Sequence, residues 1–145
     1  MEKPTILLVE DNPDDVELTL RVFKAHKLAA EVLVARDGVE ALEILLGSPH
    51  RPPCRLPTVV LLDLKLPKVD GLEVLRRIRG EPAIARLPVV MMTTSREERD
   101  VVASYQLGAN SYVQKPVGFE AFSEAVRMLG SYWLNLNICP LFPGQ

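Results

Sequence analysis

The sequence predicts one α/β domain, in which helices cover both faces of a parallel β-sheet. Five short apolar runs alternate with five segments of helical spacing along the 145 residues, and such alternation is typical of parallel sheets. Most runs are rich in Val, Ile and Leu without an alternating polar side, as expected for strands buried on both faces. With 48% hydrophobic residues, a chain of this length can bury a real core.

Five strands are predicted, at residues 5–9, 30–34, 58–62, 87–92 and 111–113. Asn12 and Pro13 suit the N-cap and the first position of the helix that follows the first strand. Asp37 suits the start of the second helix. Apolar residues at helical spacing predict three more helices, marked by Leu72, Leu75 and Ile78, by Val101, Val102 and Tyr105, and by Phe119, Phe122, Val126, Leu129 and Trp133.

Two segments lie outside this plan. Residues 47–57 hold four prolines and are predicted to form a long surface loop. We therefore assign residues 1–133 to the domain and residues 134–145 to a C-terminal tail, which contains too many prolines for a sixth helix. Leu134, Leu136 and Ile138 alternate with asparagines, a pattern typical of a strand.

The composition excludes several classes of protein. The formal net charge is only −2 and no run of five or six Lys or Arg occurs, which argues against nucleic acid or an anionic membrane as the main partner. The first residues lack the layout of a signal peptide, and no apolar stretch is long enough to span a bilayer. Cys54 and Cys139 lie far apart, which favours two free thiols in a cytoplasmic protein.

Residues that could take part in catalysis or metal binding lie at the ends of four predicted strands. The first strand ends in Glu10 and Asp11, the third in Asp63 and the fourth in Thr93, while the fifth leads to Lys115. In open parallel sheets the functional site lies outside the carboxyl ends of the strands. These side chains are therefore expected to converge at one edge of the sheet.

Clustered carboxylates resist ionising together unless a cation joins them. Mg²⁺ suits such an oxygen-only site, because it needs only one or two carboxylates beside a phosphoryl oxygen. Asp63 could then attack phosphorus as a nucleophile. Lys115 would neutralise charge on the transferred group, and Thr93 would donate a hydrogen bond to it.

Four segments together resemble the receiver domain of two-component response regulators. They are ILLVEDN at residues 6–12, LLDLKLPKVDG at 61–71, PVVMMT at 88–93 and YVQKP at 112–116. The resemblance covers residues 4–133. It implies a flavodoxin-like, doubly wound sheet of five parallel strands in the order 2-1-3-4-5, with five helices.

The resemblance also implies a role for each site residue. Asp63 would be the phosphoacceptor, supplied by a phosphohistidine on a sensor histidine kinase. Asp11 would bind Mg²⁺ directly, Glu10 would bind it through water, and the backbone carbonyl of Lys65 would be a further ligand. Lys115 would pair with the phosphoryl group, and its bond to the following proline would be cis.

In this family Thr93 would move toward the phosphoryl group and Tyr112 would change rotamer in response. The residue at position 65 influences the lifetime of the aspartyl phosphate. The opening segment, the proline loop and the aromatic last helix resemble the single-domain regulators paired with bacterial phytochromes. A bacterial phytochrome is thus the expected kinase, and the downstream protein is not identified by the sequence.

The apolar tail predicts a homodimer. An arm that packs on a second copy would cover its apolar surface, and a two-fold dimer is the commonest arrangement; folding back on the same domain is the alternative. The predicted dimer or partner face comprises Tyr112, Phe119, Phe122, Trp133, Leu134, Leu136 and Ile138.

Three other functions compete with a phosphoacceptor that is not itself an enzyme. A phosphatase of the haloacid dehalogenase type would place its nucleophile after the first strand with a second aspartate two residues on, where Pro13 stands here. A flavin-binding protein would need a phosphate loop where Glu10 and Asp11 stand. A dimerisation scaffold that is never phosphorylated is disfavoured because every key position is filled.

Other polar residues are interpreted as surface features. His26 and His50 are expected to be solvated, and Asp14 and Asp15 to be charges of a first helical turn. Arg76, Arg77 and Arg79 are expected to lie on a solvated helix face.

Overall fold

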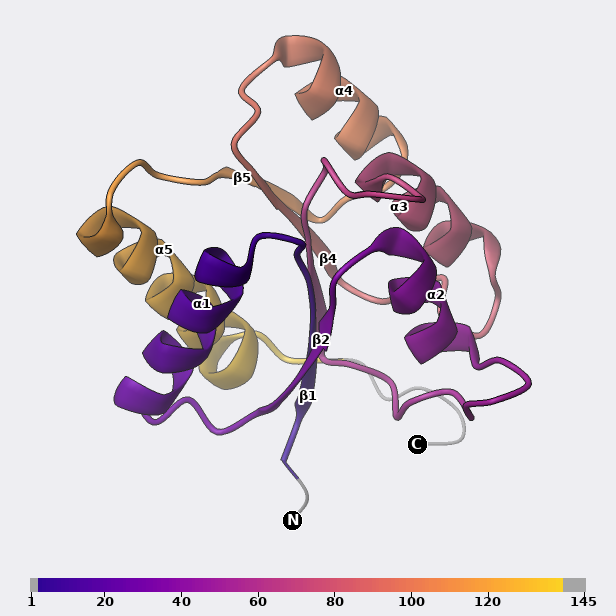
Figure 1. The fold of residues 1–145 in the computed structure, drawn as a ribbon, viewed down its shortest axis with the longest axis horizontal. Helices are drawn as coiled ribbons and strands as arrows, with labels where there is room; N and C mark the ends of the chain where they lie inside the picture. The colour runs from indigo at the N-terminus through magenta and orange to yellow at the C-terminus, as the bar shows by residue number, and fades with distance from the viewer. Residues whose placement is uncertain (1–2, 140–145) are drawn as a thin grey trace.

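The computed structural model describes residues 3–139 and confirms the predicted fold class. Five parallel strands form one sheet in the order β2-β1-β3-β4-β5 (Figure 1). The strands are β1 (Thr5–Val9), β2 (Glu31–Ala35), β3 (Val59–Leu62), β4 (Val89–Thr93) and β5 (Ser111–Gln114). Each agrees with its predicted range to within one or two residues at either end.

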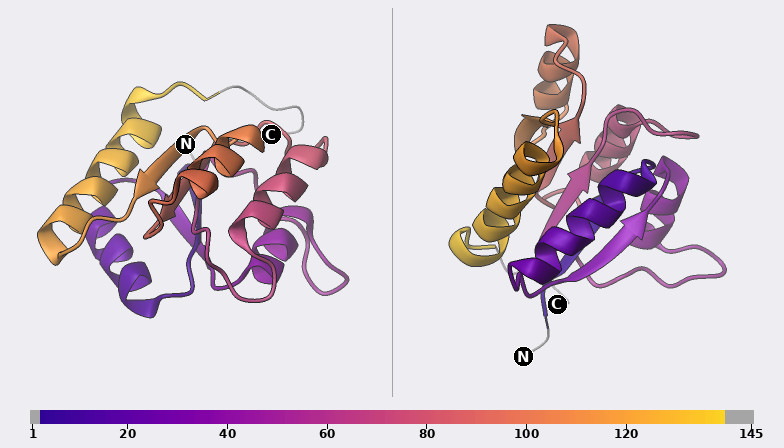
Figure 2. Two further views of the ribbon diagram at one scale, coloured as in Figure 1. Left: turned by 90° about the horizontal axis from the view of Figure 1, so that it is seen from above. Right: turned by 60° about the vertical axis from the view of Figure 1, so that its left-hand side comes forward.

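Helices cover both faces of the sheet. They are α1 (Pro13–Ala25), α2 (Gly38–Leu46), α3 (Gly71–Gly80), α4 (Glu98–Gln106) and α5 (Phe119–Ser131). Figure 1 shows α1 and α5 on one face and α2, α3 and α4 on the other, and Figure 2 shows the same two layers from above. No helix in the described part of the chain is long and apolar enough to cross a membrane.

The apolar strands divide their side chains between two cores. Leu7 and Val9 of β1 pack with α2 and α3, while Ile6 and Leu8 pack with α1 and α5. Successive side chains of a strand point to opposite faces, so each strand needs apolar residues at nearly every position. This explains the absence of polar alternation in the sequence.

The predicted helix starts are confirmed. The Asn12 side chain accepts hydrogen bonds from the backbone N–H groups of Asp14 and Asp15, and Pro13 is the first residue of α1. Asp37 caps α2 by accepting from the N–H of Glu40 at 2.8 Å. These caps satisfy N–H groups that have no partner inside the helix.

Helix α4 was predicted from a stripe that turns out to face solvent. Val102 and Tyr105 are 46% and 51% exposed, whereas the buried residue of α4 is Ser104. The Ser104 hydroxyl donates to the backbone carbonyl of Asp100 at 2.8 Å, which satisfies it inside the helix. The helix was correctly predicted, but its buried face was wrong.

The strand-like interpretation of the tail is wrong for the residues that the structure describes. Residues Tyr132–Leu136 form a π-helical turn, η1, that continues directly from α5. Trp133 is only 9% exposed and packs in the core shared by α1 and α5, which anchors this turn. The predicted boundary between residues 133 and 134 therefore falls within a helical turn, and residues 140–145 of the tail lie outside the described residues.

Arg79 was expected to lie on a solvated helix face, but its guanidinium forms hydrogen bonds to other segments of the chain. Its guanidinium donates to the carbonyls of Ala85, Leu87 and Gly108 and to Oδ1 of Asn110, over distances of 2.6–3.0 Å. Ala85 and Leu87 lie in the connection between α3 and β4, whereas Gly108 and Asn110 lie in the connection between α4 and β5. Arg79 thus joins these two connections to α3.

Candidate functional site

The carboxyl edge of the sheet brings the predicted site residues together. The backbone N–H groups of Glu10 and Asp63 donate to carbonyls of neighbouring strands, at 2.9 Å to Ala35 and 3.0 Å to Val9. The N–H of Lys115 donates to the carbonyl of Thr93 at 2.7 Å. The sheet ladder thus continues past the strand ends and fixes the backbone of these site residues.

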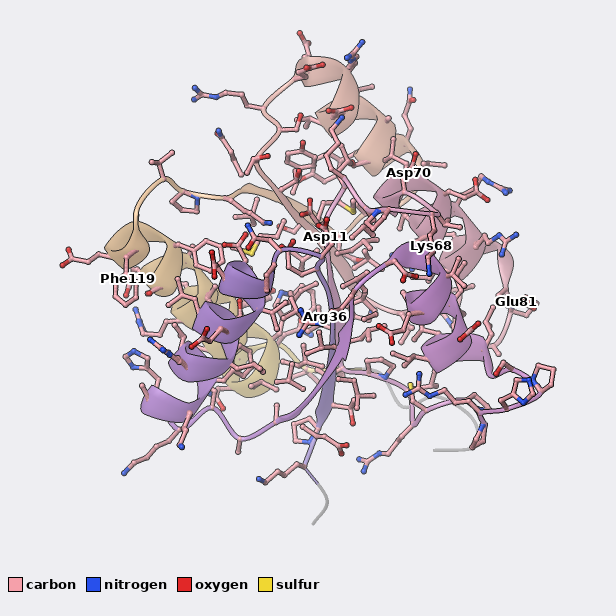
Figure 3. All side chains as sticks on the ribbon, in the orientation of Figure 1. Asp11, Arg36, Lys68, Asp70, Glu81 and Phe119 are labelled. Carbon is pink, nitrogen blue, oxygen red and sulfur yellow. The ribbon has the colours of Figure 1, made fainter. Side chains whose placement is uncertain are left out.

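Three carboxylates form the centre of the site. Glu10, Asp11 and Asp63 each offer an oxygen, and these oxygens all lie within 4.8 Å of one another. Glu10 and Asp63 are buried, whereas Asp11 is exposed at the edge of the sheet (Figure 3). An all-oxygen donor set with one open side fits a hard divalent cation that keeps part of its water shell.

Lys115 supplies the positive charge of the site. Its buried Nζ donates to a carboxylate oxygen of Glu10, to Oδ2 of Asp15 at 2.9 Å and to Oδ2 of Asp63 at 3.1 Å. Asp15 was interpreted only as a first-turn charge, so the sequence analysis missed its contact with Lys115. Its position in the first turn of α1, at the carboxyl end of β1, is the signal that could have indicated it.

The burial of these charges changes their proton affinities. Burial raises the pKa of Glu10 to about 7, and the neighbouring Asp63 charge adds to this, while the hydrogen bond from Lys115 opposes it. Burial alone would lower the pKa of Lys115, but its bonds to Glu10 and Asp15 raise it above the ordinary value. Lys115 is therefore a permanent cation at neutral pH.

The two oxygens of Asp63 have different partners. Oδ2 accepts from Lys115, and Oδ1 accepts from the backbone N–H of Lys65 at 3.3 Å. The Lys65 side chain itself is exposed. The carboxylate is therefore oriented from both sides rather than free to rotate.

Thr93 and Tyr112 are joined through Ser95. Thr93 is fully buried, and its Oγ1 accepts from the N–H of Ser95 at 3.3 Å. The Tyr112 hydroxyl donates to the carbonyl of Ser95 at 3.0 Å, and burial raises the pKa of that hydroxyl. Ser95 in turn donates to Asp100 of α4 at 2.6 Å, so the end of β4 is connected to both β5 and α4.

Two expectations from the sequence need correction, one implied by the resemblance and one concerning the partner face. Throughout residues 3–139 no peptide bond is cis, so the bond between Lys115 and Pro116 is trans in this structure. Of the predicted partner face, Phe122 and Trp133 lie inside the core between α5, α1 and the sheet. They fill that core because α5 needs large apolar side chains on its sheet side, and so they are not accessible to a partner.

The remaining residues of the predicted face differ in exposure. Phe119, Leu136 and Ile138 are exposed, and Figure 3 shows Phe119 at the first turn of α5, pointing away from the sheet. Leu134 and Tyr112 are half-buried and pack against the two cores.

Comparisons with known proteins agree with this geometry. Residues 6–127 match the response regulator receiver domain. The chain is 39% identical over 135 residues to response regulator Rcp1 of Synechocystis sp., which covers 93% of this chain and 92% of that protein. The crystal structure of Mn²⁺-bound Rcp1 superposes with a TM-score of 0.89, covering 97% of this chain and 100% of that one.

Two solved structures of phytochrome response regulators are also similar. The phosphorylated cyanobacterial phytochrome response regulator RcpA is 34% identical, with a TM-score of 0.86 over 97% of this chain and 100% of that one. The bacteriophytochrome response regulator RtBRR is 51% identical, with a TM-score of 0.72 over 99% of this chain and 86% of that one.

Proposed function

Because this chain belongs to the response regulator receiver domain family, and is thus a two-component response regulator, we propose that Asp63 accepts a phosphoryl group from a sensor histidine kinase. The observation that carries the proposal is the placement of Asp63. It is a buried carboxylate at the end of a central strand, bonded to Lys115 and flanked by Glu10 and Asp11. Few structural roles require so many charges in one buried place.

The transfer uses the Asp63 carboxylate as the nucleophile. A carboxylate oxygen attacks the phosphorus of a phosphohistidine, and the phosphorus–nitrogen bond breaks with its electron pair leaving on the imidazole. Lys65 N–H and Lys115 orient the two oxygens of Asp63 before the attack. Once the phosphoryl group is in place, Lys115 can follow it, because the lysine already reaches this pocket.

Glu10, Asp11, Asp63 and the backbone carbonyl of Lys65 are the proposed ligands of Mg²⁺. When bound, this ion neutralises charge on the phosphoryl oxygens. The carboxylates suit it because Lys115 is one positive charge among Glu10, Asp15 and Asp63 and does not balance them all. The Mn²⁺-bound structure of the similar protein Rcp1 supports a divalent cation here.

The response to phosphorylation is proposed to start at Thr93. Its buried hydroxyl stands at the end of β4 and is bonded to Ser95, which also accepts from Tyr112. A shift of Thr93 toward the phosphoryl group would break or rearrange these bonds, and would thereby release Tyr112 to change rotamer. Phosphorylation would in this way shift an equilibrium between two surface states.

A bacterial phytochrome is the proposed kinase, because similar structures at 34–51% identity are phytochrome response regulators. The proposed output is altered binding of other proteins, including a second copy of this chain. Exposed apolar residues at the end of α5 and beyond, among them Met128, Leu136 and Ile138, offer a surface for such contacts. The protein is proposed to act in the cytoplasm as a phosphoacceptor rather than an enzyme.

Intact-mass spectrometry after incubation with acetyl phosphate tests the proposal. We expect a single phosphate adduct that requires Mg²⁺ and is absent from the Asp63→Asn variant, which keeps the shape of the side chain. Size-exclusion chromatography of the same samples reports any change of oligomeric state. An adduct of equal yield on Asp63→Asn would contradict the assignment of the phosphoacceptor.

A further inference from the structure

We propose that Gly38, the first residue of α2, positions the phosphoacceptor loop although it lies outside the site. The inference rests on the proposed function of Asp63. The loop in question, residues 64–70, follows Asp63 directly and contains Lys65, whose N–H binds Asp63 and whose carbonyl is a proposed metal ligand. Its geometry therefore decides where two groups of the site stand.

The loop is held between the first turns of two helices with the same local sequence. Both α2 and α3 begin with glycine and are capped by the aspartate before it, Asp37–Gly38 in α2 and Asp70–Gly71 in α3. Each capping carboxylate accepts from an N–H of its own helix. The capped starts of α2 and α3 thus lie on either side of residues 64–70.

The first turn of α3 lies directly against the phosphoacceptor. The N–H of Gly71 donates to the carbonyl of Leu64 at 2.8 Å. A Cβ atom at Gly71 would lie 2.2 Å from the carbonyl oxygen of Asp63 and 2.8 Å from Cα of Leu64. Such separations are impossible for real atoms, so only glycine permits this approach.

The first turn of α2 makes an equally close contact with residues 67–69, near the C-terminal end of the loop. The N–H of Gly38 faces the carbonyl of Pro67 at 3.5 Å, and a Cβ at Gly38 would lie 1.9 Å from the carbonyl oxygen of Val69. The obstacle is backbone, which cannot turn aside as a flexible side chain would. Any side chain at position 38 must therefore push the loop away from α2.

An ion pair holds the same end of the loop. Lys68 has a left-handed backbone, with φ of 68°, and its Nζ lies 3.4 Å from Oδ2 of Asp37. Figure 3 shows Lys68 beside the first turn of α2. Left-handed backbone is unfavourable for a lysine, and the tether to Asp37 helps to retain it. Gly38 and Asp37 together fix residues 67–69 of the loop from a neighbouring helix.

The consequence is a displacement that reaches Lys65. Because Gly71 fixes the start of the loop at Leu64, a push from position 38 on Val69 is taken up by the residues between. Moving Lys65 loosens its hydrogen bond to Asp63 and shifts a proposed metal ligand. Loss of such supporting contacts typically lowers metal affinity by about 10–100-fold.

The test compares glycine-to-alanine variants of the full chain by Mn²⁺ affinity, measured from the electron paramagnetic resonance signal of free Mn²⁺. Gly38→Ala should weaken Mn²⁺ binding by about tenfold and slow the formation of the acetyl phosphate adduct. Gly130→Ala is the control for crowding elsewhere in the fold, because its Cβ would meet the side chains of Leu28 at 2.7 Å and of Phe23 in α1 at 3.2 Å, and neither belongs to the site. Gly80→Ala is the neutral control, since nothing lies within 4 Å of its Cβ.

The outcomes separate the two proposals. If Gly38→Ala binds Mn²⁺ as tightly as Gly130→Ala of similar stability, the positioning role is refuted. If the unaltered protein itself neither binds Mn²⁺ nor takes up phosphate, the proposed function fails instead. Should Gly38→Ala not fold, Asp37→Asn decides, because asparagine retains the N-cap but not the charge that holds Lys68. That variant should bind Mn²⁺ about twofold more weakly, and unchanged affinity would overturn the inference.

Discussion

Replacing Arg79 with alanine should destabilise the protein far more than the same change at Arg76. Both arginines lie on α3, but their surroundings differ. Arg79 makes five hydrogen bonds to three backbone carbonyls and the Asn110 amide. Arg76 is 61% exposed and, among the described residues, pairs with Glu73 on its own helix. The two positions therefore separate a structural arginine from a solvated one.

The size of the effect follows from the acceptors left behind. A hydrogen bond from a charged donor contributes about 1.5–3 kcal/mol. Partial exposure of Arg79 lets water replace some of the five bonds, so we expect a loss of about 3 kcal/mol rather than their sum. Arg76→Ala should cost far less, because an exposed ion pair within a helix contributes little to stability.

Urea unfolding followed by circular dichroism measures both free energies. For a chain of 145 residues, the difference corresponds to a melting temperature about 10 °C lower in Arg79→Ala than in Arg76→Ala. Arg79→Lys should fall between them, because an ammonium group cannot reach all four acceptors at once. The reasoning is refuted if Arg79→Ala and Arg76→Ala unfold within about 1 kcal/mol of each other.

Two further predictions concern Lys115 and Cys54. Lys115→Met leaves Glu10 and Asp63 without their cation. Thermal melting should show a loss of about 3 kcal/mol of stability in EDTA and a smaller loss in saturating Mg²⁺. Equal losses in both buffers would contradict the proposed metal site. Burial raises the pKa of the Cys54 thiol, which favours the neutral form and moves thiolate formation to higher pH. In a Cys139→Ser background the rate of iodoacetamide labelling should therefore reach its midpoint above the ordinary thiol pKa, and a midpoint at or below it would show that Cys54 is not buried as described.

The sequence was most informative where one residue type has one main structural use. Proline after asparagine at positions 12 and 13 predicts a helix start, and the structure has both residues in those roles. Runs of Val, Ile and Leu with no polar side predict a sheet covered on both faces. The order of acidic and basic residues at strand ends then predicts the site, because parallel strands bring their carboxyl ends to one edge.

The sequence was least informative where identical residues serve different purposes. Asp15 bonds to Lys115 across 100 residues of sequence, while Asp14 beside it is exposed. Both carboxylates look like first-turn charges until the fifth strand is in place. Arg79 and Arg76 differ in the same way, because only the tertiary structure decides which of them meets a group of carbonyls.

Patterns of apolar residues were ambiguous for a related reason. The alternation at Leu134 and Leu136 suits a strand, but Trp133 is buried in the core and the chain forms a helical turn there instead. On α4 the apolar residues face solvent, so periodicity alone identified the helix and not its orientation. In both cases packing against the rest of the molecule decided the outcome.

The two ends of α4 are attached in different ways. Its carboxyl end leads to Gly108 and Asn110, which accept hydrogen bonds from Arg79 of α3. Asn110 also accepts from the N–H of Val89 at the start of β4. The amino end of the helix lies close to Ser95, which bonds both to Thr93 of the site and to Asp100 of α4. If Thr93 shifts as proposed and displaces Ser95, α4 would turn about its bonded carboxyl end, and the exposed Tyr105 would move with it.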